Sequence, residues 1–223
     1  MKRSLLGFLV VFGLALVLSL SAPPAQATII DFGSGGAQGG ILTYNSGVPS
    51  VVGVGIPLDQ LIIIGAPNPA KNGTYDLSGT APDFSGGNGS ASLDFSTITH
   101  IFTITGDVSG LGVGQQALLT GTIGTWTFTP GSVGTFNVTS GTDSKSLDLL
   151  HAIGFVGNGP FFFTFSGFDI GTQLTSPSAD GTITTYSSFS ADIPDQSVPE
   201  PGILILLGIG LSAVGVLSRR IKL

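Results

Sequence analysis

The sequence of 223 residues contains no cysteine, and this excludes several kinds of chemistry at once. Without thiols the chain forms no disulfide, no thiolate metal site and no cysteine nucleophile. Exported proteins often depend on disulfides, but a domain of more than about 100 residues buries enough apolar surface to fold without them. Its stability must therefore come from the burial of side chains in a core.

Basic residues and glutamate are almost as scarce. Residues 28–197 contain twelve Asp, no Glu, no Arg and only two lysines, Lys71 and Lys145, so this stretch has a formal charge of −10. Binding to nucleic acid requires patches of Lys and Arg, so we expect no nucleic-acid partner. An acidic surface should also be repelled by anionic lipid.

Groups that titrate near neutral pH are few, and this limits the scope for catalysis. His100 and His151 are the only histidines, and no Gly-x-Ser-x-Gly nucleophile elbow is present. His100 begins an apolar run and His151 lies in a predicted helix, so both have an ordinary structural interpretation. We therefore expect no catalytic residue and no enzymatic activity. A secreted hydrolase is kept as a less favoured alternative to the two non-enzymatic functions given at the end of this section.

No cofactor is expected, although a structural Ca²⁺ ion stays open because Asp- and Gly-rich exported domains often bind this cation. Residues 86–91 begin like the Gly-Gly-x-Gly-x-Asp repeat of calcium-binding β-rolls, but Ala91 stands where the Asp ligand is needed. We therefore assign no metal ligand.

The first 27 residues have the three parts of a secretory signal peptide. Met1-Lys2-Arg3 is basic, residues 5–20 are apolar, and Ala25-Gln26-Ala27 is a small-x-small cleavage site. We predict cleavage by signal peptidase after Ala27, so that Thr28 becomes the N-terminus of an exported protein.

The body of the chain, residues 28–191, predicts a mainly β domain. Short runs of apolar and β-branched residues are separated by Gly, Ser, Asn, Asp or Pro. Apolar side chains alternate within several runs, as at Ala91, Leu93 and Phe95, which favours an antiparallel β-sandwich or jelly-roll-like fold. The predicted strands are 28–32, 41–45, 61–65, 74–77, 90–95, 101–105, 117–129, 135–139, 161–168 and 182–191.

One short helix and three loops complete the predicted domain. Asp143 is expected to cap a helix over residues 144–153, with Leu147, Leu150 and Ile153 on one side and Gly154 at its end. The Gly-, Ser- and Asn-rich composition predicts loops at 34–40 and 86–90. Residues 192–198 are expected to form a linker.

Aromatic residues leave two interpretations open. Trp126, Tyr44, Tyr75 and Tyr186 would stack on a glycan if they were exposed, whereas in the core they would only stabilise the fold. The core interpretation is favoured for Trp126. The run Phe161-Phe162-Phe163, with Phe165, is also expected in the core.

The last residues have three parts in a fixed order. Val198, Pro199, Glu200 and Pro201 form an extended motif because both prolines disfavour helix. Residues 202–218 are apolar and would span about 25 Å as a transmembrane helix, the short end of what a bilayer requires. The basic tail, 219–223, contains Arg219, Arg220 and Lys222, which favour a cytoplasmic C-terminus and retention in the membrane.

This arrangement resembles the PEP-CTERM sorting domain, through Val198-Pro199-Glu200-Pro201, Leu206-Leu207-Gly208, Gly210-Leu211 and Arg219-Arg220. That domain occurs on exported proteins of Gram-negative bacteria that make exopolysaccharide. The resemblance implies recognition by exosortase, an integral-membrane protease, and cleavage at or near Pro-Glu-Pro. It covers about 26 residues and leaves the preceding domain without an assigned role.

Together these features predict an exported, non-enzymatic protein of the cell surface or extracellular matrix. Its precursor would be anchored transiently in the inner membrane, and its partners would be signal peptidase, exosortase and exopolysaccharide in a biofilm. The alternative is a carbohydrate-binding module, with or without Ca²⁺. An exposed aromatic platform would favour the glycan-binding module, and a polar Ser/Thr surface without a pocket would favour the matrix protein.

Overall fold

The computed structural model describes residues 27–34, 39–79, 89–157, 163–165, 167–177 and 182–197. The described strands belong to one compact unit, Ala27–Val198. The strands are β1 Ile29–Gly33, β2 Ile41–Asn45, β3 Ser50–Leu58, β4 Gln60–Ile64, β5 Gly73–Asp76, β6 Ala91–Ser96, β7 Ile101–Val108, β8 Val113–Ile123, β9 Trp126–Thr129, β10 Val133–Val138, β11 Gly141–Lys145, β12 Phe163–Phe165, β13 Phe168–Pro177 and β14 Ile183–Ser197. The helices are α2 Leu147–Ala152 and two single 3₁₀ turns, Pro69–Lys71 and Ser109–Leu111.

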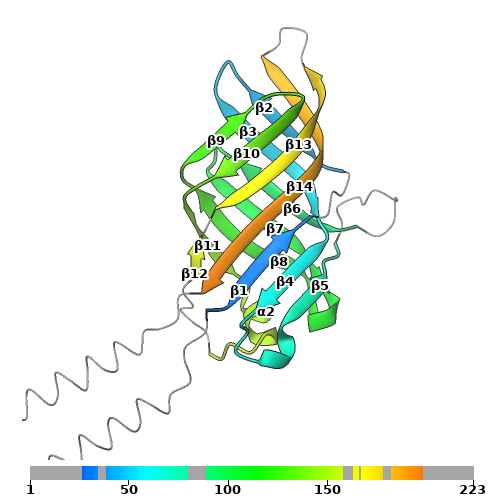
Figure 1. Ribbon diagram of the computed structural model, residues 1–223, viewed down its shortest axis with the longest axis vertical. Coiled ribbons are helices and arrows are strands. Elements are labelled where there is room, and N and C mark those ends of the chain that lie inside the picture. The colour runs from blue at the N-terminus through cyan, green and yellow to red at the C-terminus, as the bar shows by residue number, and fades with distance from the viewer. Residues whose placement is uncertain are drawn as a thin grey trace, which may run out of the picture. The chain divides into compact units, whose positions relative to one another are not determined.

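These strands form one antiparallel sheet of 14 strands (Figure 1). The main order is β11-β8-β7-β6-β3-β2-β14-β1-β4-β5, and β13, β10 and β9 extend in turn from the other edge of β14. The predicted fold class, mainly β and antiparallel with one short helix, is confirmed. All the described strands lie in a single sheet, however, because β14 is long enough to pair with four neighbours.

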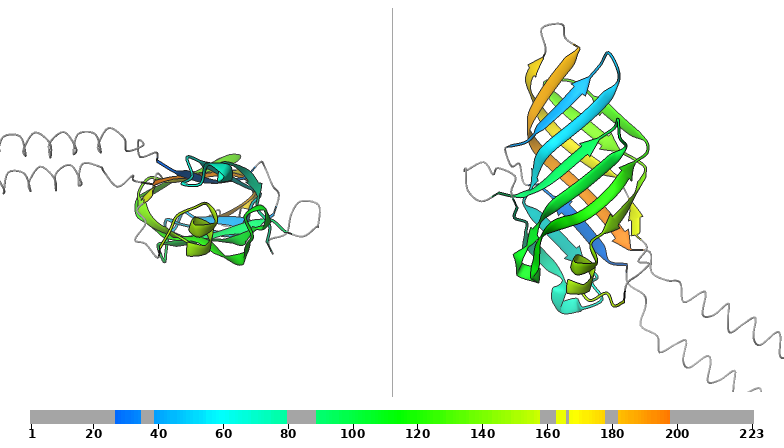
Figure 2. Two further views of the ribbon diagram at one scale, coloured as in Figure 1. Left: turned by 90° about the horizontal axis from the view of Figure 1, so that it is seen from below. Right: turned by 180° about the vertical axis from the view of Figure 1, so that it is seen from behind.

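The sheet curls round because β8 leads into β9 and β10 leads into β11. Gly124 N donates to Ser140 O at 2.8 Å and Thr139 N donates to Thr125 O at 2.9 Å, so the two strand pairs form one bent hairpin. This hairpin joins β11 at one end of the strand order to β13 on the other branch (Figure 2).

Alternation places one face of the sheet in the core. In β6, Ala91, Leu93 and Phe95 are buried while the intervening residues are only partly covered, as the sequence predicts. Phe95 stacks on Phe136 with ring centroids 4.8 Å apart, and Phe168 meets Phe136 edge-on at 5.8 Å. Edge-to-face and offset aromatic pairs of this kind stabilise a core beyond simple area burial.

Strand β3 is absent from the sequence prediction because Gly53, Gly55 and Pro57 lower its strand propensity. The structure explains two of these residues. A side chain at Gly53 would collide with the ring of Phe95, and Gly55 has a positive φ of 62° at a register shift between β3 and β6. Gly55 N donates to Asp94 Oδ1 at 2.8 Å, which fixes the bulge.

The predicted helix begins later than expected, and its cap is a different residue. Helix α2 starts at Leu147, and the Ser146 side chain accepts a hydrogen bond from Leu149 N at 3.1 Å. Asp143 instead lies within β11, because residues 141–145 pair with the end of β8. The helix ends before Gly154, which has a positive φ of 105°.

The predicted linker also differs in part. Residues 192–197 continue β14 rather than leaving the sheet, and they pair with β1 from Gly33↔Asp192 to Ile29↔Gln196. The buried side chains of Ile193 and Asp195 maintain the alternation here, so pairing overrides the low strand propensity of Asp and Pro. The loops predicted at 34–40 and 86–90 lie mostly outside the described residues.

Candidate functional site

Nearly all of the predicted sorting and processing residues lie outside the described residues: Ala25, Val198, Pro199, Glu200, Pro201, Arg219, Arg220 and Lys222. Ala27 is described and immediately precedes β1. Within the ranges that the structure describes, none of the helices is long and apolar enough to cross a membrane.

The structure brings the two ends of the compact unit together. Strands β1 and β14 are antiparallel neighbours, and Ile29 is the partner of Gln196. The Thr28 hydroxyl donates to Gly65 O at 2.8 Å, and Thr28 is buried. The segment that contains the sorting motif therefore follows directly from a paired strand at Ser197.

Both histidines contact backbone carbonyls. His100 lies in the turn between β6 and β7, with Nδ1 3.1 Å from Ile123 O. His151, on α2, places Nε2 2.7 Å from Gly157 O. Among the interactions of the described residues, neither ring is paired with a carboxylate, so the arrangement offers no histidine–aspartate pair for acid–base chemistry.

The candidate glycan-stacking aromatics pack against the core. Tyr186 is 1% exposed, and Phe128 meets its ring edge-on at 5.3 Å. Tyr44 contacts Phe128 at 4.6 Å, and Trp126 is half-buried 6.0 Å from Phe136. The Tyr75 hydroxyl donates to Lys71 O at 2.9 Å. These four side chains do not form one exposed platform.

Six Ser and Thr side chains, together with Asp94 and the exposed Ile101, lie on the outer face of β6, β7, β8 and β11, and we call this surface the Ser/Thr face. Cross-strand pairing sets its residues in two rows, because Thr103 lies opposite Thr120 and Thr122 opposite Thr142. The hydroxyls of Thr122 and Thr142 are hydrogen-bonded at 2.8 Å. The rows are Asp94, Thr103, Thr120 and Ser144, and then Ser96, Ile101, Thr122 and Thr142.

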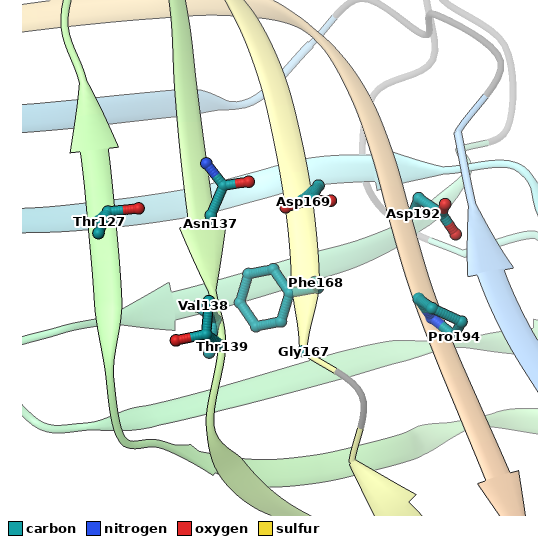
Figure 3. Close-up of a pocket in the computed structure, with 9 residues that line it drawn as sticks. All are labelled: Thr127, Asn137, Val138, Thr139, Gly167, Phe168, Asp169, Asp192 and Pro194. Atoms are coloured by element: carbon teal, nitrogen blue, oxygen red, sulfur yellow. The ribbon is translucent and has the colours of Figure 1, made fainter.

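A hollow of about 350 Å³ lies over β9, β10, β13 and the C-terminal part of β14. Four of its side chains, Thr127, Asn137, Asp169 and Asp192, form a row across adjacent strands (Figure 3). The hollow thus offers a hydroxyl, an amide and two carboxylates side by side. This set suits hydrogen bonding to a polyhydroxyl ligand.

Asp192 also affects the pKa of Asp31, which lies on the neighbouring strand β1. Burial, the charge of Asp192 and a hydrogen bond with Asp192 together raise the pKa of Asp31 to about 6, against a backbone hydrogen bond from Ile193 that lowers it. Asp31 Oδ1 is buried and has no hydrogen-bond partner among the described residues. Over the parts of the chain that the structure describes, no three metal-ligating side chains are placed to hold an ion.

The most unusual group in the interior is a buried lysine between two aspartates, which we call the Lys145 cluster. Lys145 Nζ contacts Asp143 Oδ2, and it lies 3.0 Å from Asp195 Oδ2. All three side chains are almost fully excluded from solvent, at 0–1% exposure. Burial is the main cause that raises the pKa of Asp195 to about 7; Lys145 lowers this pKa and Asp143 raises it, and both effects are included in that value.

Sequence reasoning missed this cluster because Asp143 had been placed at a helix cap. The signal was present in the run Gly141-Thr-Asp-Ser-Lys145, which alternates like a strand and puts Asp143 and Lys145 on one face. Asp195 gives no such signal, because only the fold brings β14 to the end of β11.

Comparison with known proteins identifies the C-terminal segment. Residues 197–220 match the family model of the PEP-CTERM protein-sorting motif. No curated protein and no solved structure matches the chain. The predicted resemblance is thus confirmed for this segment: the chain carries a PEP-CTERM sorting motif, which indicates an exported protein that is sorted to the cell surface through exosortase.

Proposed function

We propose that this protein is a non-enzymatic component of the cell surface or extracellular matrix, and that its β domain contacts exopolysaccharide. The sorting motif supports delivery to the surface. The contact itself would be made by the domain, which presents exposed hydroxyl groups on the Ser/Thr face.

The observation that carries this proposal is the Ser/Thr face. Thr120, Thr122, Thr142 and Ser144 are exposed and held at fixed spacing by the strands. A rigid row of hydroxyls hydrogen-bonds to sugar hydroxyls without ordering flexible side chains, so little conformational entropy is lost. Each contact is weak, but a long polysaccharide meets many copies of the surface, and avidity then strengthens binding.

The positions of the aromatic and histidine side chains support the same proposal. Trp126 and Tyr186 pack against the core, and both histidine rings contact backbone carbonyls. These side chains would otherwise be the leading candidates for a stacking platform or for acid–base chemistry.

A glycan array and a pull-down on the producing organism's own exopolysaccharide test the proposal. The wild-type protein should be retained, and the double variant Thr120→Val, Thr122→Val should be retained several-fold less. Valine keeps the β-branched shape that a strand favours and removes only the hydroxyl.

Thr74→Val provides a matched control, because Thr74 is an exposed threonine of β5 at the other end of the strand order. The control variant should bind like wild type. If wild type is not retained, or if the double variant and the control are retained equally, the proposal is wrong.

The hollow favours a second candidate, a carbohydrate-binding module that takes a short polyol or sugar at β10 and β13. Asn137→Ala and Asp169→Ala would weaken such binding, while the Ser/Thr variants would not. A glycan array that gives one strong oligosaccharide signal sensitive to Asn137 and Asp169 would favour this module over the matrix protein.

We also propose how the precursor is processed during export. Signal peptidase would cut after Ala27, and residues 202–218 would halt translocation as a transmembrane helix with the basic tail in the cytoplasm. Exosortase would then bind the extended Pro199-Glu200-Pro201, where Glu200 supplies the chain's one glutamate. Mass spectrometry of the exported protein should find Thr28 at its N-terminus.

A further inference from the structure

The Lys145 cluster brings together residues from strands that do not pair with each other in the described sheet. Lys145 ends β11, where its strand partner is Leu119 of β8. Asp195 lies near the end of β14, between Ile30 of β1 and Phe165 of β12. Only the curling of the sheet places the amine of one strand against the carboxyl group of the other.

The surroundings of the cluster are apolar. Ile30, Leu119 and Ile193 are fully buried, and all of them belong to the core. An ion in such a site loses its hydration, and a buried group tends to become neutral by moving a proton. Transfer of a proton from Lys145 to Asp195 produces a neutral amine beside a neutral carboxylic acid.

The contact with Asp195 differs from the contact with Asp143. Lys145 Nζ donates a hydrogen bond to Asp143 Oδ2. It lies 3.0 Å from Asp195 Oδ2 as an ion-pair contact, and Asp195 Oδ1 is buried without a hydrogen-bond partner among the described residues. The carboxyl carbon of Asp195 is therefore no more than about 4.3 Å from the nitrogen, and a shift of the side chain by about 1 Å would bring the two atoms to near-attack distance.

From this geometry we propose that Lys145 and Asp195 condense to form an intramolecular amide between Lys145 Nζ and Asp195 Cγ, with Asp143 transferring the proton. The protein would thus contain a covalent cross-link between β11 and β14. This inference is independent of the proposed contact with exopolysaccharide.

The reaction is balanced and needs no external reagent. The lone pair of the neutral amine attacks Cγ of the protonated Asp195, and the new carbon–nitrogen bond forms. The Asp143 carboxylate accepts a proton from the nitrogen and delivers it to the departing hydroxyl. The carbon–oxygen bond then breaks, one water molecule leaves, and Asp143 is a carboxylate again.

Asp195, rather than Asp143, is the residue that reacts. The raised pKa of Asp195 keeps its carboxyl group partly protonated near neutral pH, which gives the departing oxygen its proton. Asp143 already accepts a hydrogen bond from Nζ, the position of a base. The product also replaces a buried amine and a buried acid with a neutral amide, which is less costly to bury.

Peptide mass spectrometry of the exported protein tests the cross-link. After complete denaturation, trypsin cleaves after a free lysine, but it cannot cleave after a lysine whose amine is in an amide. Cleavage after Lys71 should therefore be complete, while the peptide from Asn72 to Lys145 should be absent. Chymotrypsin should yield a joined pair of peptides, one containing Lys145 and one containing Asp195, lighter than their sum by one water molecule.

Substitutions test which residues form the cross-link. Lys145→Met and Asp195→Ala should contain no joined peptide, whereas Lys71→Met, the control at the other lysine of the domain, should keep it. Asp195→Asn should give the same joined product as wild type, because the amide loses ammonia instead of water. Asp143→Ala should leave most of the protein unlinked.

The outcomes decide between a bond and an ion cluster. Recovery of the free Asn72–Lys145 peptide from denatured wild-type protein would overturn the proposal, and this measurement does not depend on any variant folding. Fragmentation that places the bond on Asp143 would refute the assignment of Asp195. Full cross-linking of Asp143→Ala would refute the role of Asp143.

Discussion

Replacing Asp31 with asparagine is expected to stabilise the protein at neutral pH and to have little effect in acid. Burial, with the charge of Asp192, raises the pKa of Asp31 from its ordinary 3.8 to about 6. Between these values the folded protein binds more protons than the unfolded chain, so its stability falls as the pH rises through this window. Asparagine is neutral at every pH and removes this loss.

The size of the effect follows from the shift. Each pKa unit corresponds to about 1.4 kcal/mol, which sets an upper limit of about 3 kcal/mol for the stability lost above pH 6. Asp31 remains partly exposed, so solvent screening reduces this figure. We expect Asp31→Asn to gain about 1 kcal/mol at neutral pH.

Urea denaturation, followed through the fluorescence of the single tryptophan, Trp126, measures this gain. The free energy of unfolding should be compared for variant and wild type at about pH 4 and about pH 8. Asp76→Asn, at an exposed carboxylate of β5, controls for a general change of charge. A difference between Asp31→Asn and wild type that stays constant with pH, or reverses its sign, would refute the reasoning.

Three further perturbations have distinct expected results. Lys145→Met should destabilise the fold by about 3–5 kcal/mol, because it leaves the buried side chains of Asp143 and Asp195 without the lysine that both contact, while Lys71→Met should change the free energy of unfolding by less than about 0.5 kcal/mol in the same denaturation assay. Phe136→Ala should lower the free energy of unfolding by about 3–5 kcal/mol, because it opens a cavity among stacked rings. Ile98→Ala, at a 68% exposed site, should lower it far less. Equal decreases for the two variants would contradict the packing argument. Replacing Pro199-Glu200-Pro201 with alanines should leave uncleaved protein in the inner-membrane fraction on an immunoblot, and normal release would show that the motif is only a spacer.

Much of the sheet could be predicted because its strands alternate clearly. In β6 the period of two is unbroken, and the prediction at 90–95 differs from the strand by one residue. Strand β3 could not be found in this way, since Gly53, Gly55 and Pro57 are needed for close packing and a bulge. Their local propensity therefore opposes the pairing that the fold imposes.

The candidate sites could be predicted from the sequence less completely than the fold could. The sorting motif is local, so its residues identify it without a structure. The Lys145 cluster and the hollow are products of long-range pairing: Asp169 meets Asp192 only through the register of β13 with β14. A chain with twelve aspartates has too many possible pairs for spacing alone to select these.

The pairing of β14 also determines how the domain would bear mechanical load. A force applied at Ser197 along the strand would act on β14, which is 15 residues long and hydrogen-bonded to β1, β2, β12 and β13. If the opposing force acts on the Ser/Thr face, β14 is sheared against these neighbours rather than peeled away from one of them. Many hydrogen bonds then resist the force together, and Asp195 is a buried side chain on that path.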